Sequence, residues 1–188
     1  MDTTVQRKTD RRTLYSRMII KEALLSIMKT KEYGQITVTD LCREAEISRG
    51  TFYTHYDNLS QVIDALFDDV LDNTHSILKQ IGYEADKDPC AYPLCVFLRE
   101  NKKYQPLFFS DALYTQAIDR ISKYGFEHFA ERMQKSSELT REELFALFTF
   151  QLGGCLSVCK RNIHVADEQW EQVQCSIDLF LKNGFQNL

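Results

Sequence analysis

The fold is decided by residues 36–56, which read ITVTDLCREAEISRGTFYTHY. Thr37 is a good N-cap for a short helix that ends near Glu44, and Asp40 three residues later can complete a capping box. The next four residues predict a tight turn, after which Ser48 can cap another short helix. Two short helices joined by a four-residue turn are typical of a helix-turn-helix.

The helix that follows Ser48, residues 49–56, is apolar on one side and polar on the other. Phe52 and Tyr56 are one turn apart and share the inner face. The outward positions offer a guanidinium, hydroxyls, an imidazole and a glycine to the base edges and phosphates of a major groove; they are Arg49, Gly50, Thr51, Tyr53, Thr54 and His55. This segment therefore predicts contact with double-stranded DNA.

Apolar residues recur every three and four positions along the whole chain, and strand-like runs are absent, so we expect an all-α fold. Before the helix-turn-helix we expect a basic, mobile arm over residues 1–12. A first helix over residues 13–31 follows it, with an apolar face formed by Leu14, Ile20, Ala23, Leu24, Ile27 and Met28. Gly34 is expected to end this helix in a left-handed conformation.

The later helices are expected at residues 59–81, 92–101, 103–109, 111–133, 141–161 and 168–183, with a polar linker at 82–89. Thr140 and Glu143 predict a capping box, and Asp167 is the expected N-cap of the last helix. Three parts follow from this pattern. They are a tri-helical helix-turn-helix DNA-binding domain with its basic arm (1–58), a connecting helix (59–82) and a larger C-terminal helical domain (83–188).

Charge is distributed unevenly along the chain. Residues 1–56 contain ten Lys/Arg against seven Asp/Glu, whereas residues 57–188 contain thirteen against twenty, so the net charge of −4 hides a basic N-terminal end. Residues 1–31 alone contain eight basic and three acidic side chains. A basic end on an acidic body indicates a protein that touches phosphates with one end only.

The runs ITVTDLC (36–42) and AEISRGTFYTHY (45–56) resemble the TetR/AcrR family of transcription regulators, over about residues 14–67. The resemblance implies contact with DNA by the neighbourhood of Thr37 and by Thr39, Arg49, Thr51, Tyr53 and His55. It also implies a homodimer and a ligand in the C-terminal domain that changes the spacing of the two DNA-binding ends.

Two positions depart from the family pattern. Glu46 replaces a glycine in the turn, where a left-handed conformation costs a non-glycine residue about 1 kcal/mol. Leu59 stands where the family usually has a lysine that contacts a backbone phosphate. One lost phosphate contact reduces the magnitude of the slope of log K against log salt by roughly 0.9. Both changes could weaken DNA binding without preventing it.

The C-terminal part offers a dimer interface more clearly than a ligand site. The helix over 141–161 is apolar nearly all round, and Gly153 and Gly154 would admit a second backbone; the last helix adds Trp170, Val173, Ile177, Phe180 and Leu181. Ten aromatic residues between Tyr104 and Phe150 can line a cavity or pack a core. Cys42 is expected in the core, and Cys155 and Cys159 share a helix face that could serve a redox switch or a soft metal.

These features favour a transcriptional repressor that a small-molecule effector releases from its operator, with no cofactor and no metal. The alternative is a regulator of the same fold that a partner protein controls, including a co-activator. No nucleophile–base pair, phosphate loop or metal motif supports an enzyme. Residues 1–17 lack the apolar region of a signal peptide, and no apolar run approaches the roughly 20 residues that span a bilayer, so we expect a cytoplasmic protein without a membrane partner.

Overall fold

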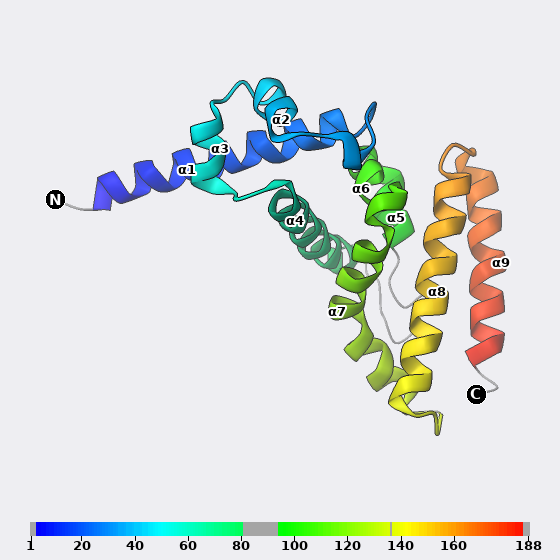
Figure 1. The fold of residues 1–188 in the computed structure, drawn as a ribbon. Helices are drawn as coiled ribbons and strands as arrows, with labels where there is room; N and C mark the ends of the chain where they lie inside the picture. Colours follow the sequence, from blue (N-terminus) through cyan, green and yellow to red (C-terminus); the bar gives the residue numbers. More distant parts are fainter. Residues whose placement is uncertain (1–2, 81–93, 136, 186–188) are drawn as a thin grey trace. The chain divides into compact units, whose positions relative to one another are not determined.

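The computed structural model describes residues 3–80, 94–135 and 137–185 of the chain. Over these ranges it contains α-helices and short 3-10 helices and no strand (Figure 1), which confirms the all-α prediction with an N-terminal helix-turn-helix. The α-helices are α1 (Thr3–Ile27), α2 (Val38–Glu44), α3 (Arg49–His55), α4 (Leu59–Gln80), α5 (Leu94–Glu100), α6 (Gln105–Phe109), α7 (Tyr114–Met133), α8 (Arg141–Asn162) and α9 (Asp167–Phe185). The 3-10 helices are η1 (Tyr33–Gln35), η2 (Lys102–Tyr104) and η3 (Asp111–Leu113).

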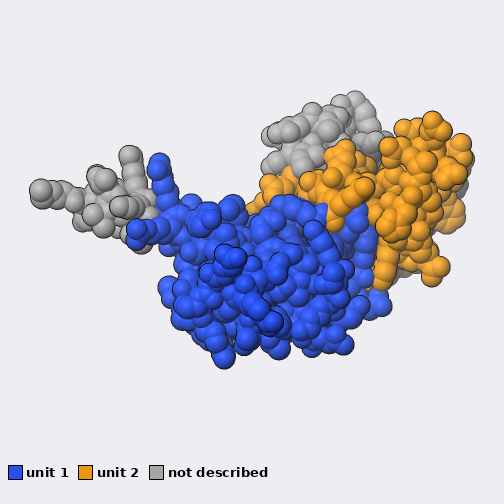
Figure 2. Space-filling model, turned by 90° about the horizontal axis from the view of Figure 1, so that it is seen from above, with its two compact units in different colours: residues 1–70, 103–113 blue, residues 71–102, 114–188 orange. Residues whose placement is uncertain are grey.

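The chain divides into two compact units (Figure 2). Unit 1 comprises residues 1–70 and 103–113, and unit 2 comprises residues 71–102 and 114–188. The three parts expected from the sequence, with boundaries at residues 58 and 82, are assigned by function, and their limits stay a prediction.

In unit 1 the second half of α1 packs against α2 and α3. Ile20 and Leu24 of α1 and Phe52 of α3 are all 0% exposed, so one small core holds the helix-turn-helix together. The segment 103–113 belongs to the same unit. Its Phe108 ring meets Phe67 of α4 edge-on with centroids 5.3 Å apart.

The N-terminal end of α1 differs from the expected mobile arm. The helix begins at Thr3 and continues without interruption to Ile27, so residues 3–12 are helical. The reason is local, because this stretch contains no glycine or proline and is rich in good helix formers such as Gln6, Arg7 and Lys8. Leu14, expected on the buried face, is 66% exposed.

The C-terminal end of α1 was also predicted wrongly. The helix ends at Ile27 rather than Lys31, where the amides of Lys29 and Thr30 donate to the carbonyls three residues earlier, Ser26 and Ile27, at 3.2 and 3.1 Å. Gly34 lies inside the 3-10 turn η1 and does not adopt the expected left-handed conformation.

In unit 2 the long helices α7 and α8 pack against one another. Phe126 of α7 meets Phe145 and Phe148 of α8 at centroid distances of 5.0 and 5.9 Å, and Phe129 lies 5.3 Å from Phe148. These four aromatic residues therefore form a cluster between the two helices.

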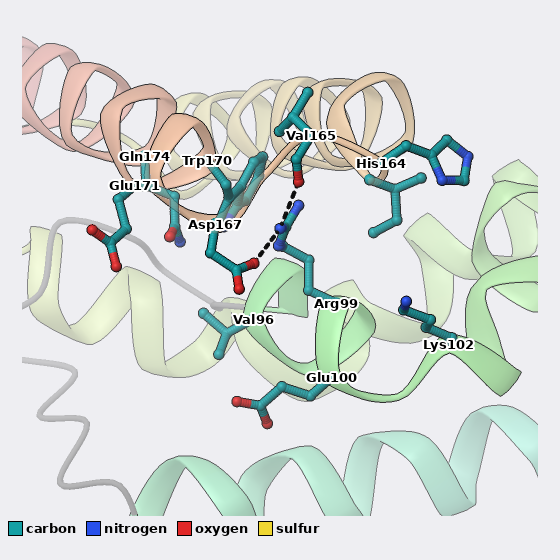
Figure 3. Close-up of a pocket in the computed structure, with 11 residues that line it drawn as sticks. Val96, Arg99, Glu100, Lys102, His164, Val165, Asp167, Trp170, Glu171 and Gln174 are labelled. Carbon is teal, nitrogen blue, oxygen red and sulfur yellow. Dashed lines mark hydrogen bonds and ion pairs between the residues drawn. The ribbon is translucent and has the colours of Figure 1, made fainter.

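Arg99 of α5 fixes the corner between α8 and α9 (Figure 3). Its guanidinium donates to the carbonyls of Asn162 and Val165, both at 3.1 Å, and to the Asp167 carboxylate at 2.7 Å. Its guanidinium carbon also lies 5.0 Å from the centroid of the Trp170 ring. Asp167 is the first residue of α9, so the prediction that it is the N-cap was wrong by one position, and its carboxylate binds Arg99 instead.

The later helices otherwise lie near their expected positions. The capping box at the start of α8 is confirmed: the Thr140 amide and hydroxyl both donate to Glu143 Oε2 at 2.8 Å. These hydrogen bonds hold the pKa of Glu143 below its ordinary value. The linker expected at residues 82–89 lies outside the described residues.

Replacing Thr140 by alanine is expected to lower the free energy of unfolding by about 1 kcal/mol, because the first turn of α8 loses its cap. Urea unfolding followed by circular dichroism measures this change. Thr149→Ala is the matched control, since its hydroxyl bonds only the Phe145 carbonyl within the same helix. Equal unfolding midpoints for Thr140→Ala and wild type would contradict the role of the cap.

Candidate nucleic-acid interface

The capping box of α2 is present as predicted. The Thr37 hydroxyl accepts the Asp40 amide at 3.1 Å, and Asp40 Oδ2 accepts the Thr37 amide at 3.0 Å. Two amide donors at the helix start are thus satisfied by one reciprocal pair. The cap fixes where α2 begins and leaves Thr37 and Thr39 exposed at its start.

Asp40 also collects two cations that the sequence did not assign to it. Lys31 donates to Oδ2 at 2.7 Å, and Arg43 donates to Oδ1 at 2.8 Å. The hydrogen bonds from Lys31 and then from Thr37 hold the pKa of Asp40 well below its usual range. Lys31 and Arg43 are therefore partly neutralised within the protein.

The turn between α2 and α3 contains the strained residue expected from the sequence. Glu46 has a φ of 53°, which confirms that the position where the family has glycine is left-handed. The Ile47 amide bonds the Cys42 carbonyl at 3.0 Å across this turn. The Glu46 side chain is exposed, so its carboxylate stands beside the outward surface of the helix-turn-helix.

Helix α3 has the two faces that the sequence predicts. Ser48 Oγ accepts the Thr51 amide at 3.0 Å and caps the helix, while Phe52 and Tyr56 are 0% and 7% exposed. Six of the eight predicted DNA-contacting residues are exposed and two are half-buried; the exposed ones are Thr37, Thr39, Arg49, Gly50, Tyr53 and Thr54, and the half-buried ones are Thr51 and His55. All eight belong to α2, its cap and α3.

Several of these polar groups already have partners within α3. Arg49 donates to the Tyr53 hydroxyl at 3.4 Å, a contact that raises the pKa of Arg49 and keeps its charge. The Thr54 hydroxyl donates to the Gly50 carbonyl at 2.9 Å, and the hydroxyls of Thr51 and Ser48 share a bond of 2.9 Å. Arg49 and Tyr53 thus stand together, one helical turn apart, as the paired polar groups of the exposed face.

Helix α3 is joined to α1 through Tyr56, the C-cap residue that directly follows it. The guanidinium carbon of Arg17 lies 5.9 Å from the centroid of the Tyr56 ring. Burial raises the pKa of the Tyr56 hydroxyl, so this group stays neutral. Sequence reasoning missed the contact because no short-range pattern connects Arg17 with a residue 39 positions later.

Two further predictions concern the same unit. Cys42 is buried, as expected, and burial raises the pKa of its thiol. Leu59 is the first residue of α4 and is half-buried. Its side chain packs against the protein and provides no positive charge for a phosphate contact.

Unit 2 contains a pocket of about 610 Å³ between α5 and the corner of α8 and α9 (Figure 3). Its lining is mostly charged or polar, including Arg99, Lys102, His164, Asp167 and Glu171, with Trp170 at its wall. None of the ten aromatic residues proposed as cavity lining contributes to this pocket.

Cys155 and Cys159, which share a face of α8, differ in their burial. Burial raises the pKa of Cys159 to about 12, which keeps it as a thiol, while Cys155 is half-buried. In the described ranges, no three His, Cys, Asp or Glu side chains gather as a metal site. By length and composition alone, α8 is apolar enough to cross a membrane, but one such helix is weak evidence because the core helix of a soluble protein has the same character.

No protein-family model matches the chain. A segment of 62 residues is 32% identical to the uncharacterized HTH-type transcriptional regulator YxbF of Bacillus subtilis (strain 168), and covers 32% of this chain and 16% of YxbF. A segment of 58 residues is 29% identical to DhaS, the HTH-type dhaKLM operon transcriptional activator of Lactococcus lactis subsp. lactis (strain IL1403), and covers 31% of each protein.

The solved structure of a dihydroxyacetone kinase operon activator, DhaS, has a similar fold. Its TM-score is 0.54 at 18% identity, over 93% of this chain and 98% of the other. The chain is thus related to HTH-type transcriptional regulators over about a third of its length, and it shares a fold with one of them over nearly all of it.

The Asp40 network is expected to make stability depend on pH. A carboxyl whose pKa is lowered on folding adds stability above its unfolded-state pKa, about 3.9, and loses it as pH falls through the folded value. Wild type is therefore expected to unfold at a higher midpoint than Asp40→Asn at pH 7, with a difference that shrinks below about pH 4. Thermal unfolding between pH 7 and pH 3 measures it, with exposed Asp119→Asn as the control. A difference between wild type and Asp40→Asn that does not vary with pH would rule out the charge as its source.

Proposed function

We propose that this chain is a DNA-binding transcription regulator of the TetR/AcrR type that reads double-stranded DNA with α3. The observation that carries the proposal is the division of α3 into a buried Phe52–Tyr56 face and an exposed face with Arg49 and Tyr53. The N-terminal motif and the HTH-type relatives support the same function.

The chemistry of the exposed residues suits a major groove. A guanidinium can donate two parallel hydrogen bonds to guanine, and hydroxyl and imidazole groups can contact bases or phosphates. Arg49 is the strongest candidate for base contact, with Tyr53 positioned beside it by their 3.4 Å contact. Thr37 and Thr39 at the start of α2 are proposed to contact the DNA backbone.

We propose a homodimer that forms through α8 and α9, because both helices expose large apolar side chains. Phe150 of α8 is 72% exposed, and Leu179 and Phe180 of α9 are 61% and 67% exposed. Two helices from each subunit would bury these residues in a four-helix interface. A two-fold symmetric operator with half-sites about 34–36 Å apart would match such a dimer.

Details of this interface differ from the sequence expectation. Trp170 and Leu181 are 6% and 8% exposed, so they pack within the subunit and are not available to a partner. Gly153 makes room for its own chain, since an added Cβ would lie 2.9 Å from the Tyr114 hydroxyl. Gly154 faces open space and can still admit a second backbone.

The sign of regulation has two candidates. Repression relieved by an effector bound in residues 83–188 is the expectation from the family resemblance. The name of DhaS, an operon activator, favours activation as a second candidate, with control by a partner protein as a variant of it. Deleting the gene and measuring transcription beside the mapped operator separates them, because expression rises for a repressor and falls for an activator.

DNA binding is tested with duplexes selected from a random pool by the wild-type protein. Arg49→Ala is expected to weaken binding to the selected duplex by about ten-fold or more and to relax the preference at one base pair, because one bidentate base contact contributes about 1–3 kcal/mol. Arg161→Ala, an exposed arginine of α8, is the control and should bind like wild type. A failure to select any duplex would refute the proposed function.

The dimer is tested by light scattering after gel filtration. Wild type is expected to show twice the chain mass, and Phe150→Ser with Phe180→Ser is expected to shift the population to monomer, because two exposed apolar anchors are lost. Tyr124→Ser changes an exposed aromatic residue of α7 and should leave the mass unchanged. A wild-type protein that is monomeric at micromolar concentration would refute the interface.

A further inference from the structure

The N-terminal half of α1, residues 3–18, is a continuous stretch of helix with no assigned role. The buried apolar residues of this 25-residue helix begin at Ile20, whereas Leu14, Tyr15 and Met18 are 66%, 62% and 49% exposed. Figure 1 shows this part of α1 extending past α3 toward the N-terminus. At 1.5 Å per residue, the ten residues from Thr3 to Arg12 form a rod about 15 Å long.

Positive charge on this rod is available to an external partner. In unit 1 several cations are neutralised internally: Lys21 pairs with Asp69, Lys31 and Arg43 pair with Asp40, and Lys103 pairs with Glu22. Arg11 and Arg12 are exposed, and neither has an ion-pair partner among the described residues.

The rod is continuous with the proposed DNA-reading surface. Arg17, about one and a half turns after Arg12, lies against Tyr56 at the end of α3. Duplex DNA is a stiff polyanion that continues past the base pairs read by a recognition helix, with one negative charge per about 1.7 Å of its axis. A basic rod fixed beside that helix therefore meets phosphates outside the base pairs that α3 reads.

We propose that the N-terminal half of α1 is a second DNA-contacting element, which binds backbone phosphates flanking the α3 half-site through Arg11 and Arg12. This inference rests on the proposed function. It differs from a mobile basic arm because residues 11 and 12 share one continuous helix with Arg17, which lies against Tyr56, so their backbone needs less ordering on binding. Tyr15 and the apolar Leu14 and Met18 lie on the exposed part of the same helix, where they can pack against sugar edges.

The test uses the full-length protein and the duplex selected by wild type. Affinity is measured against salt concentration for Arg11→Ala, Arg12→Ala and the double variant. Each lost phosphate contact reduces the magnitude of the negative slope of log K against log salt by about 0.9. The double variant is therefore expected to have a slope about 1.8 smaller in magnitude than wild type. Hydroxyl-radical footprints should lose protection at the outer flanks and keep it at the centre.

Lys29→Ala is the matched control, since Lys29 is exposed, unpaired among the described residues, and lies in the turn after the opposite, C-terminal end of α1. Its slope should equal that of wild type. Circular dichroism should show folded protein for every variant, because exposed arginine-to-alanine changes preserve helix propensity.

Thr13→Pro separates a rigid helix from a mobile arm, because proline interrupts the helix and keeps both arginines. If the helix must be continuous, Thr13→Pro shows a less steep slope of log K against log salt than Thr13→Ala, and its footprint protects shorter DNA flanks. An unchanged slope in Thr13→Pro or in the double arginine variant overturns this inference alone, while wild type that binds no duplex overturns the proposed function as well. The double variant is also compared with wild type for binding to phosphatidylglycerol vesicles. If it loses vesicle binding while its salt slope for DNA stays that of wild type, the surface belongs to a membrane and the inference is overturned.

Discussion

The burial of one face of α3 is the interaction on which the DNA-reading end depends. A helix of seven residues is far too short to persist alone in water, because nucleation costs more than a few hydrogen bonds return. Phe52, fully buried, contributes about 1.5–3 kcal/mol by leaving water, and Tyr56 adds to it beneath Arg17. The exposed residues of α3 keep a defined direction only because these two aromatic rings are fixed.

In unit 1 some basic side chains form ion pairs within the protein, and others have none among the described residues. Asp40 pairs with Lys31 from another segment and with Arg43 of its own helix, and Glu22 pairs with Lys103. Arg11, Arg12 and Arg49 have no such pair in the part of the chain that the structure describes. Exposed ion pairs add little stability, about 0–1 kcal/mol each, so their main effect here is on which cations remain free. The net charge of −4 therefore says little about the surface that would meet DNA.

Local signals predicted the helix-turn-helix well. The caps at Thr37, Ser48 and Thr140 depend on neighbours three residues away, so a sequence alone can reveal them. The predicted DNA contacts follow from the inward and outward sides of α3, whereas the contacts themselves await experiment. The helical N-terminus of α1 was missed because it has no apolar pattern, although its residues favour a helix. The Arg99 anchor was not predictable because it joins residues more than 60 positions apart.

Unit 1 is discontinuous in sequence, since residues 103–113 complete a core that begins at the N-terminus. Phe108 covers Phe67, Leu107 is fully buried, and Lys103 binds Glu22 of α1. During synthesis the helix-turn-helix and its core of Ile20, Leu24 and Phe52 leave the ribosome first, and residues 103–113 follow only after α4. A fragment cut after α4 would therefore keep the helix-turn-helix core but expose the face of Phe67 that Phe108 covers.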